Sequence, residues 1–267
     1  MHAIGGRREA PRWWWWGLAM LVALSGRAAM ATDAGHYPSH PVHLIVPFGP
    51  GSGGDFLARL VGARLARDLG EPVVVENRPG AAGNIAMNIV ARADPDGYTL
   101  VLGNAGTNTV NPSLYRRPGF DPIRSFVPIT KLTTVPSVIV AGPSSPVHTL
   151  AQLIELARRE PGQLDYATLG LGLSSHLAMV EVAEQGFPGF DMQSWYGVLA
   201  PHGTPSRIVD RLNADLVRIV HEPDIAKAIV DAGQQVVGNT TDEFAADIRA
   251  GLARGRKLVD QLGIHVD

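Results

Sequence analysis

The fold of this chain is limited above all by one stretch near its N-terminal end, where a short apolar run breaks into a turn rich in glycine and proline. The run covers residues 43–46 and the turn covers residues 47–54. After the turn, apolar residues at positions 57, 60, 61, 65 and 69 recur at helical spacing. Ser52 stands three residues before Asp55, which is the spacing of a helix capping box. The stretch therefore predicts a strand, a glycine loop and a helix in succession.

A loop of this kind is suited to bind a small anion. Glycine lets several backbone N–H groups converge on one point, and the dipole of the following helix favours negative charge there. The alternative is a tight turn whose glycines only satisfy backbone geometry. We expect the loop to hold a carboxylate-bearing solute, and the candidate ligand-binding residues are Phe48, Gly49, Pro50, Gly51, Ser52, Gly53, Gly54 and Asp55.

Asp55 has two interpretations within this loop. An aspartate at a helix start is most simply a cap or a partner of the helix dipole. In a carboxylate site its charge would repel the ligand, unless it paired with an amino or hydroxyl group of the solute.

Strands and helices alternate after the first helix. Residues 73–76 and 99–102 are predicted to be buried strands, and a helix through Ile85, Ile89 and Val90 lies between them. Residues 103–108 form a small polar loop after the later strand. This alternation predicts an α/β fold with a parallel, doubly wound sheet, in which the loops at 48–55 and 103–108 meet beyond the carboxyl ends of the strands.

The rest of the chain continues in the same style. Residues 115–136 are expected to cross to another domain, residues 137–141 to form a strand, and Thr149 to cap a helix that stops at 161–162. In the last third we expect a strand at 195–200, a helix ending at Gly233 and an edge strand at 235–237. Between the first strand and that helix, Thr204 is expected to cap a helix with Pro205 at its first position and an apolar stripe at positions 208, 209, 212, 216, 219 and 220. Thr240 and Glu243 have the spacing of a capping box at the start of the final helix.

A second glycine loop precedes the last third and repeats the anion-binding argument. It contains the candidate ligand-binding residues Gly170, Gly172, Ser174, Ser175 and His176. The serines suit hydroxyl donation to a carboxylate or capping of the following helix. A hydrolase is disfavoured, because no G-x-S-x-G elbow is present and adjacent helical positions do not face one another. Dinucleotide binding is disfavoured too, because serine replaces the third glycine of the fingerprint.

The composition excludes several classes of protein. The 267 residues carry a formal net charge of −2, which argues against a general nucleic-acid binder. There is no cysteine, which excludes disulfides, thiolate metal sites and cysteine nucleophiles. The nine histidines are scattered, so we expect neither a metal nor a cofactor.

The first 31 residues read as a secretory signal peptide. Arg7, Arg8 and Arg12 precede an apolar run at 13–24, and residues 29–31 offer a small-x-small cleavage pattern. A retained N-terminal anchor is the alternative. Removal of this segment would leave a protein outside the cytoplasm, and we expect a periplasmic location.

Several runs taken together resemble the tripartite tricarboxylate transporter substrate-binding proteins, also called the Bug family of periplasmic receptors. The runs lie at residues 46–55, 74–80, 95–100, 166–177 and 194–201, and continue from Thr204 to Asn213. The resemblance implies a two-lobed periplasmic-binding-protein fold of type II that closes on a small carboxylate. It implies binding through the loops at 48–55 and 169–176, together with a polar loop that contains Asn104, Ala105 and Thr107. A membrane permease or a sensor protein would be the partner.

The sequence departs from the family pattern within the second lobe. Residues 181–186 join directly two segments that the family separates by roughly sixty residues, so the second lobe is expected to be truncated. The predicted organisation is domain 1 at 38–138 plus 197–267, with domain 2 inserted at 139–196. Two functions stay open: a receptor for a di- or tricarboxylate or an acidic amino acid, and a degenerate paralogue that folds but binds no solute.

Overall fold

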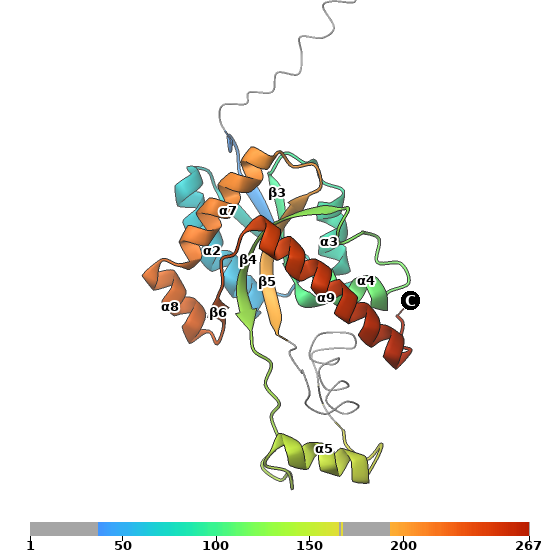
Figure 1. Cartoon of the computed structure of the whole chain (residues 1–267). Helices are drawn as coiled ribbons and strands as arrows, with labels where there is room; N and C mark the ends of the chain where they lie inside the picture. The colour runs from blue at the N-terminus through green and yellow to red at the C-terminus, as the bar shows by residue number, and fades with distance from the viewer. Residues whose placement is uncertain (1–36, 166, 168–192, 267) are drawn as a thin grey trace, which may run out of the picture. The chain divides into compact units, whose positions relative to one another are not determined.

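The computed structural model describes residues 37–165, 167 and 193–266, and a six-stranded sheet lies at their centre (Figure 1). The strands are β1 (Val42–Val46), β2 (Val73–Asn77), β3 (Thr99–Asn104), β4 (Phe126–Val135), β5 (Ser194–Pro201) and β6 (Gln235–Val236). Their order across the sheet is β2-β1-β3-β5-β4-β6.

The sheet is mixed, which corrects the prediction of a parallel sheet for its second half. β1 runs parallel to both β2 and β3, as the alternation of strands and helices predicted. β5 runs antiparallel to β3 and to β4, and β4 runs antiparallel to β6. The β4–β5 connection spans residues 136–193, so no short helix-bearing crossover dictates the direction of β5.

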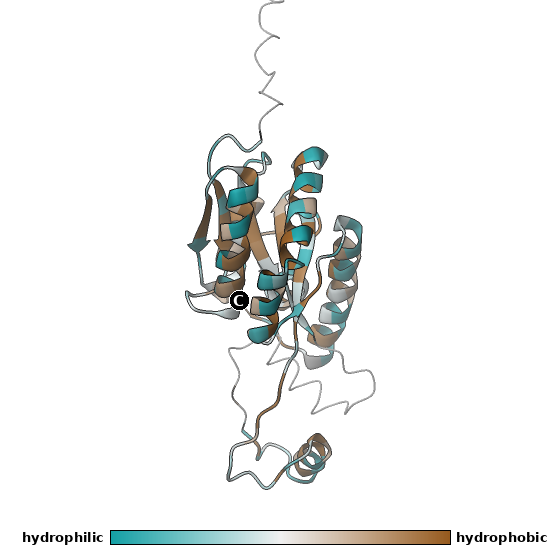
Figure 2. Ribbon diagram, turned by 90° about the vertical axis from the view of Figure 1, so that its left-hand side faces the viewer, coloured by the Kyte–Doolittle hydropathy of each residue, from teal (hydrophilic) through white to brown (hydrophobic). Residues whose placement is uncertain are grey.

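Helices cover the sheet from two sides (Figure 1). α2, α7 and α8 contact one another, whereas α9 contacts the short helical segments η2 and α4, and α3 packs on β1, β3 and β5. Figure 2 shows strands that are mostly hydrophobic and helices that carry both hydrophobic and hydrophilic residues. The helices are α2 (Gly53–Leu69), α3 (Asn84–Ala91), α4 (Asn111–Leu114), α5 (Leu150–Arg159), α7 (Ser206–Val220), α8 (Pro223–Asp231) and α9 (Thr241–Leu262), with η1 (Ala81–Gly83) and η2 (Gly106–Val110).

α2 begins and ends where its sequence predicted. The Ser52 hydroxyl accepts a hydrogen bond from the Asp55 N–H, and Gly70 ends the helix in the left-handed conformation at φ 75°. The apolar positions of this helix, among them Leu57, Val61 and Leu65, are buried. The predicted strand–loop–helix unit is confirmed.

The start of α7 differs from its prediction. The Thr204 hydroxyl donates to the Pro201 carbonyl at 2.8 Å, and no side chain caps the helix, whose flanking residue is Pro205. The predicted apolar stripe is confirmed, since all six of its members are buried: Ile208, Val209, Leu212, Leu216, Ile219 and Val220.

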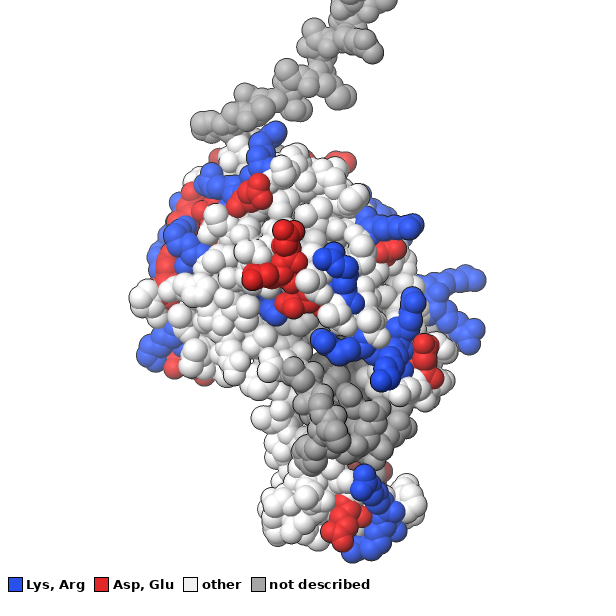
Figure 3. Space-filling model, in the orientation of Figure 1, with Lys and Arg blue, Asp and Glu red and all other residues white. Residues whose placement is uncertain are grey.

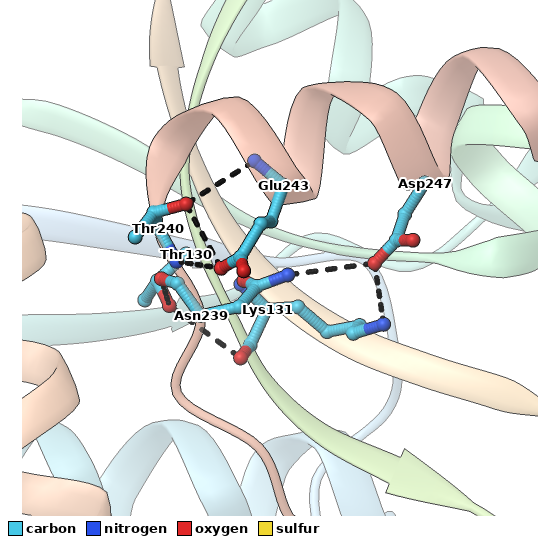
Figure 4. A network of polar contacts seen from close by, with 6 residues as sticks. All are labelled: Thr130, Lys131, Asn239, Thr240, Glu243 and Asp247. Carbon is cyan, nitrogen blue, oxygen red and sulfur yellow. Dashed lines mark hydrogen bonds and ion pairs between the residues drawn. The ribbon is translucent and has the colours of Figure 1, made fainter.

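A polar network ties α9 to β4 (Figure 4). The predicted capping box is present, because the Thr240 hydroxyl accepts from the Glu243 N–H and the Glu243 carboxylate accepts from the Thr240 N–H. These donors on Thr240 lower the pKa of Glu243. One turn further along, Asp247 pairs with Lys131 of β4 at 2.5 Å. The network fixes the N-terminal end of α9 over the sheet.

Three other predicted elements are wrong. Residues 115–136 do not leave the domain: β4 lies in the main sheet, where its β-branched residues pack well. Residues 137–141 contain no strand, and Val138 and Val140 are 79% and 84% exposed. Strand β2 is half-exposed rather than buried, because it lies at the sheet edge.

Residues 103–108 are also more regular than the predicted loop. Gly103 and Asn104 complete β3, and the chain then turns into the π-helical segment η2. α9 approaches this segment closely through two glycines four residues apart. A Cβ on Gly251 would touch the Thr109 side chain, and a Cβ on Gly255 would overlap the Thr109 carbonyl oxygen. The stripe of small residues on α9 is therefore required for the packing of this helix.

The predicted domain boundaries remain a prediction. Domain 1 contains β1–β4 and everything from Gly197 onward, and the described part of the predicted insert contains α5, capped by Thr149 as expected. Residues 194–196, placed in the insert, are the first residues of β5.

Replacement of Gly255 by alanine should lower the free energy of unfolding by about 1–3 kcal/mol, because a backbone carbonyl cannot move aside as a side chain can. Gly62→Ala is the matched control, since Gly62 is also buried within a helix and its Cβ would make only ordinary contacts with Val73 and Val75. That control should be neutral or stabilising, because alanine is the better helix former. Urea unfolding of both variants checks this, and equal stability of the two would contradict the packing described.

Candidate functional site

The candidate site lies at one edge of the sheet, where three parallel strands end. β1 is paired with β2 on one side and with β3 on the other, so their carboxyl ends lie side by side. Three connections therefore start together: β1 to α2, β2 to η1 and β3 to η2. In open α/β sheets this is where ligands bind.

The buried carboxylate of Asp55 holds the first connection in shape. Its Oδ2 accepts from the Gly51 N–H at 2.9 Å, and its Oδ1 accepts from the Asn77 amide at 2.8 Å and from Arg59 at 3.0 Å. The same Asn77 amide also donates to the Phe48 carbonyl at 3.0 Å. The Asp55 carboxylate thus holds the loop at Gly51, and the Asn77 amide holds it at Phe48.

These contacts define the electrostatic state of Asp55. Its hydrogen bond to Arg59, and those to Gly51 and Asn77, lower the pKa of Asp55 from 3.8 to about 2 against the opposing effect of burial. The side chain is 5% exposed, and both oxygens are engaged by the protein. The geometry supports the cap interpretation of Asp55, as an anchor of the loop.

The back of the loop is packed against β5. Phe48 and Tyr196 meet edge to face at 5.6 Å between ring centroids, and a Cβ on Gly54 would overlap the Phe48 ring. Gln234, which is buried, donates to the Gly53 carbonyl at 3.3 Å and accepts from Thr133 of β4. The glycine at position 54 is therefore needed for close packing.

The tip of the loop faces open space. Nothing lies within 4 Å of a Cβ placed on Gly49 or Gly51, and both residues are exposed together with Pro50. Gly51 has a φ of 81°, a conformation that side chains disfavour. The tip immediately precedes the N-terminus of α2, where the helix dipole favours an anion.

Asn104 and Thr107 bond to each other behind the site. The Thr107 N–H donates to Asn104 Oδ1 at 2.8 Å, and the Asn104 N–H donates to the Thr107 hydroxyl at 3.1 Å. Thr107 is fully buried and Asn104 nearly so, whereas Ala105 is half-buried. These residues form a rigid support next to the first loop.

The connection from β2 to η1, at residues 78–83, was not among the predicted site residues. All four residues from Gly80 to Gly83 have positive φ, including Ala81 at 46° and Ala82 at 51°. Non-glycine residues in this region cost on the order of 1–3 kcal/mol each, so the surrounding structure must hold them. The Asn111 amide does so by donating to the Ala82 carbonyl at 3.0 Å. The run of Pro79, Gly80 and Gly83 after a parallel strand was the signal available in the sequence.

The three connections touch one another. A Cβ on Gly83 would meet Thr107 and Pro47, which belong to the third strand's connection and to the first loop. Asn111 also donates to Asn84 Oδ1 at 2.8 Å. The second glycine loop, with Gly170, Gly172, Ser174, Ser175 and His176, lies outside the described residues.

The described residues contain neither a metal cluster nor a membrane-spanning helix. Within the described ranges, no three histidine, aspartate or glutamate side chains come together as a metal site would require. In the same ranges, no helix has the length and apolar character to cross a membrane.

Replacement of Asp55 by asparagine should lower the free energy of unfolding at pH 7 by on the order of 1–2 kcal/mol, because a charge-assisted network is lost. The pKa of Asp55 is lower in the folded state than in the unfolded chain. The stability that it adds is therefore present above about pH 4 and disappears as the pH falls toward 2. Urea unfolding across pH 2–7 measures the difference between the two proteins.

Asp231→Asn is the control, since this exposed side chain forms only an ion pair with Lys227 on the helix surface. We expect a change below about 0.5 kcal/mol for it at every pH. A pH-independent difference between wild type and Asp55→Asn would show that the charge of Asp55 does not hold the loop.

Comparison with known proteins identifies the family. Residues 57–186 and 178–264 match the family model described as "Tripartite tricarboxylate transporter family receptor". A protein encoded in the tcbD-tcbE intergenic region of Pseudomonas sp. strain P51 is 28% identical over 319 aligned positions, which cover 94% of each chain. The alignment is longer than this 267-residue chain, and the two matched segments meet at 178–186, consistent with the predicted internal deletion.

Solved structures show the same fold. Rpa4515 from R. palustris, solved with adipate, has a TM-score of 0.76 at 28% identity, with 86% of this chain and 99% of that chain covered. MatC from Rhodopseudomonas palustris, solved with bound malate, has a TM-score of 0.74 at 25% identity, with 84% of this chain and 100% of that chain covered. The predicted periplasmic-binding-protein fold is confirmed, and the chain belongs to the tripartite tricarboxylate transporter receptor family.

Proposed function

We propose that this chain is a periplasmic receptor that captures a small dicarboxylate and presents it to the membrane permease of a tripartite tricarboxylate-type transporter or to a sensor. The observation that carries the proposal is the loop at residues 48–54. Its tip is open, it precedes the N-terminus of α2, and Asp55 and Asn77 hold it in place. Such a loop offers backbone N–H groups that need no movement to receive a carboxylate.

The ligands of two relatives support the class of solute. Adipate and malate, bound by the two structural neighbours, are both dicarboxylates. Tricarboxylates and acidic amino acids share the carboxylate that the loop would bind, so they belong in the same test. The family is one of receptors, and the role proposed here is binding without chemistry.

We place the second half of the site on the other glycine loop. Ser174 and Ser175 would donate hydroxyl hydrogen bonds, Gly170 and Gly172 would expose backbone N–H groups, and His176 would contribute a ring N–H. Residues 1–31 would direct export to the periplasm and then be removed. Domain 2, at 139–196, would supply the opposite wall of the cleft in shortened form.

The shortened lobe also favours a second candidate. A receptor that has lost roughly sixty residues of one lobe loses part of the wall that encloses the solute. A paralogue that folds through domain 1 but binds no solute is therefore the alternative function. Isothermal titration calorimetry separates the two.

Titration of the purified protein with adipate, malate, citrate and glutamate should give saturable heat with at least one of them. Gly49→Asp should abolish that heat, because the new carboxylate would stand at the open tip and repel the ligand. Gly49→Asn is the matched control: it is almost the same size but uncharged, so it should weaken binding far less. Gly172→Asp applies the same test to the second loop.

Circular dichroism confirms that the variants are folded, as the open space around Gly49 leads us to expect. Folded wild-type protein that gives no heat with any of the four compounds would favour the degenerate paralogue. Equal loss in Gly49→Asp and Gly49→Asn would exclude charge repulsion as the reason.

A further inference from the structure

A second surface of the molecule has the features of an interaction site. A hollow of about 530 Å³ lies between the outer side of α3 and residues 115–118. Ile85, Asn88, Ile89 and Arg92 contribute from α3, and Arg117 contributes from the facing segment. Asn88 joins the two walls, because its amide donates to the Asn84 carbonyl at 2.9 Å and to the Pro118 carbonyl at 2.7 Å.

The hollow is too open to be a small-molecule pocket. Ile85 and Ile89 remain 48% and 41% exposed although both line it. Small ligands bind in clefts that bury most of their surface, which walls as exposed as these cannot do. Two large aliphatic side chains one helical turn apart, left in water, are typical of a surface that another protein covers.

The charge of the hollow indicates the chemistry of that protein. Arg92 and Arg117 are its only ionisable lining groups apart from Tyr115, and none of the described residues lining it is acidic. Arg92 donates to the neutral Asn88 at 3.3 Å, and neither Arg92 nor Arg117 forms an ion pair with an acidic side chain among the described residues. Arginines without a carboxylate partner are suited to accept one from outside.

The cationic character continues onto α9 from Arg249 to Lys257. This helix exposes Arg249, Arg254, Arg256 and Lys257, and Figure 3 shows Lys and Arg side chains gathered over this part of the molecule. Tyr115, which lines the hollow, packs beside Leu258 and Val259 of the same helix. Asp260 is the acidic residue exposed on the same half of this helix, so cationic side chains predominate there although the whole chain has a net charge of −2.

The hollow also adjoins the candidate site. Ala81 and Asn84 line it, and the residues between them in the same strained connection, Ala82 and Gly83, contact Asn111 and Thr107 next to the first glycine loop. A protein seated in the hollow would therefore lie one connection away from the bound solute.

We propose that this hollow is the docking site for an acidic segment of a partner protein, one that places aliphatic side chains on Ile85 and Ile89 and carboxylates on Arg92 and Arg117. The identification of that partner as the component that receives the solute rests on the proposed function. The docking itself does not, because its geometry involves none of the residues assigned to solute binding.

Selection from a phage-displayed library of random 12-residue peptides against the purified protein tests the proposal. Enriched peptides should combine Asp or Glu with Leu, Ile, Val or Phe. A synthetic copy should bind about tenfold or more weakly to the double variant Arg92→Glu/Arg117→Glu, measured by fluorescence anisotropy. The variant Ile85→Ser/Ile89→Ser should lose a similar factor, and both pairs are exposed enough for the fold to tolerate the changes.

Arg67→Glu/Arg207→Glu is the matched control, because these exposed arginines lie on α2 and α7, away from the hollow. It should bind the peptide as the wild type does. Enriched peptides without acidic residues would overturn the proposal. So would equal peptide binding by Arg92→Glu/Arg117→Glu and by the control Arg67→Glu/Arg207→Glu. Sedimentation with phosphatidylglycerol vesicles that is lost in Arg92→Glu/Arg117→Glu, without any enriched peptide, would assign the surface to a membrane instead.

Solute calorimetry on Arg92→Glu/Arg117→Glu keeps the two proposals separate. The heat of binding should match that of wild type, since neither arginine touches the glycine loop. If this variant loses peptide binding but keeps solute binding, the docking site is supported. If it also loses solute binding, the claim that docking is independent of the glycine loops is overturned.

Discussion

The carboxylate of Asp55 is the interaction on which the candidate site depends. A loop of four glycines within residues 49–54 has no preferred shape of its own, because glycine loses more conformational freedom on folding than any other residue. Asp55 compensates by accepting from Gly51 at one oxygen and from Asn77 and Arg59 at the other. The loop is therefore preorganised before any solute arrives, and since the Gly51 N–H is engaged by Asp55, the donors offered to a solute are those at the N-terminus of α2.

Local sequence patterns predicted much of the fold. The hydroxyl caps at Ser52, Thr149 and Thr240 and the apolar stripe of α7 depend only on neighbours a few residues away, and all are confirmed. Local patterns could not predict the antiparallel direction of β5, because this direction depends on pairing with β3, about a hundred residues earlier in the chain. The π-helical turn at Gly106–Val110 was missed for the same reason, since α9 packs against it.

In the candidate site too, local sequence predicts some features, whereas others depend on residues far apart in the chain. The glycine loop at 48–54 could be found from composition and spacing, and the structure places it at the end of β1 before α2. The strained backbone of the connection at 78–83 could not be found in this way, because its positive-φ alanines are held by Asn111, a residue 29 positions away from Ala82. The role of Asp55 was ambiguous for a similar reason: its partner Asn77 ends a different strand.

The burial pattern of α3 carries information that its helical spacing does not. The helix predicted through Ile85, Ile89 and Val90 is confirmed, but it buries Ala86, Met87 and Val90 against the sheet and leaves the two isoleucines half-exposed. Burial of an isoleucine side chain is worth roughly 1.5–3 kcal/mol. A fold that leaves two such side chains half-exposed gains only part of that free energy from them in the isolated chain. The rest becomes available only when another apolar surface covers them, and the unpaired arginines beside them restrict which surface that is.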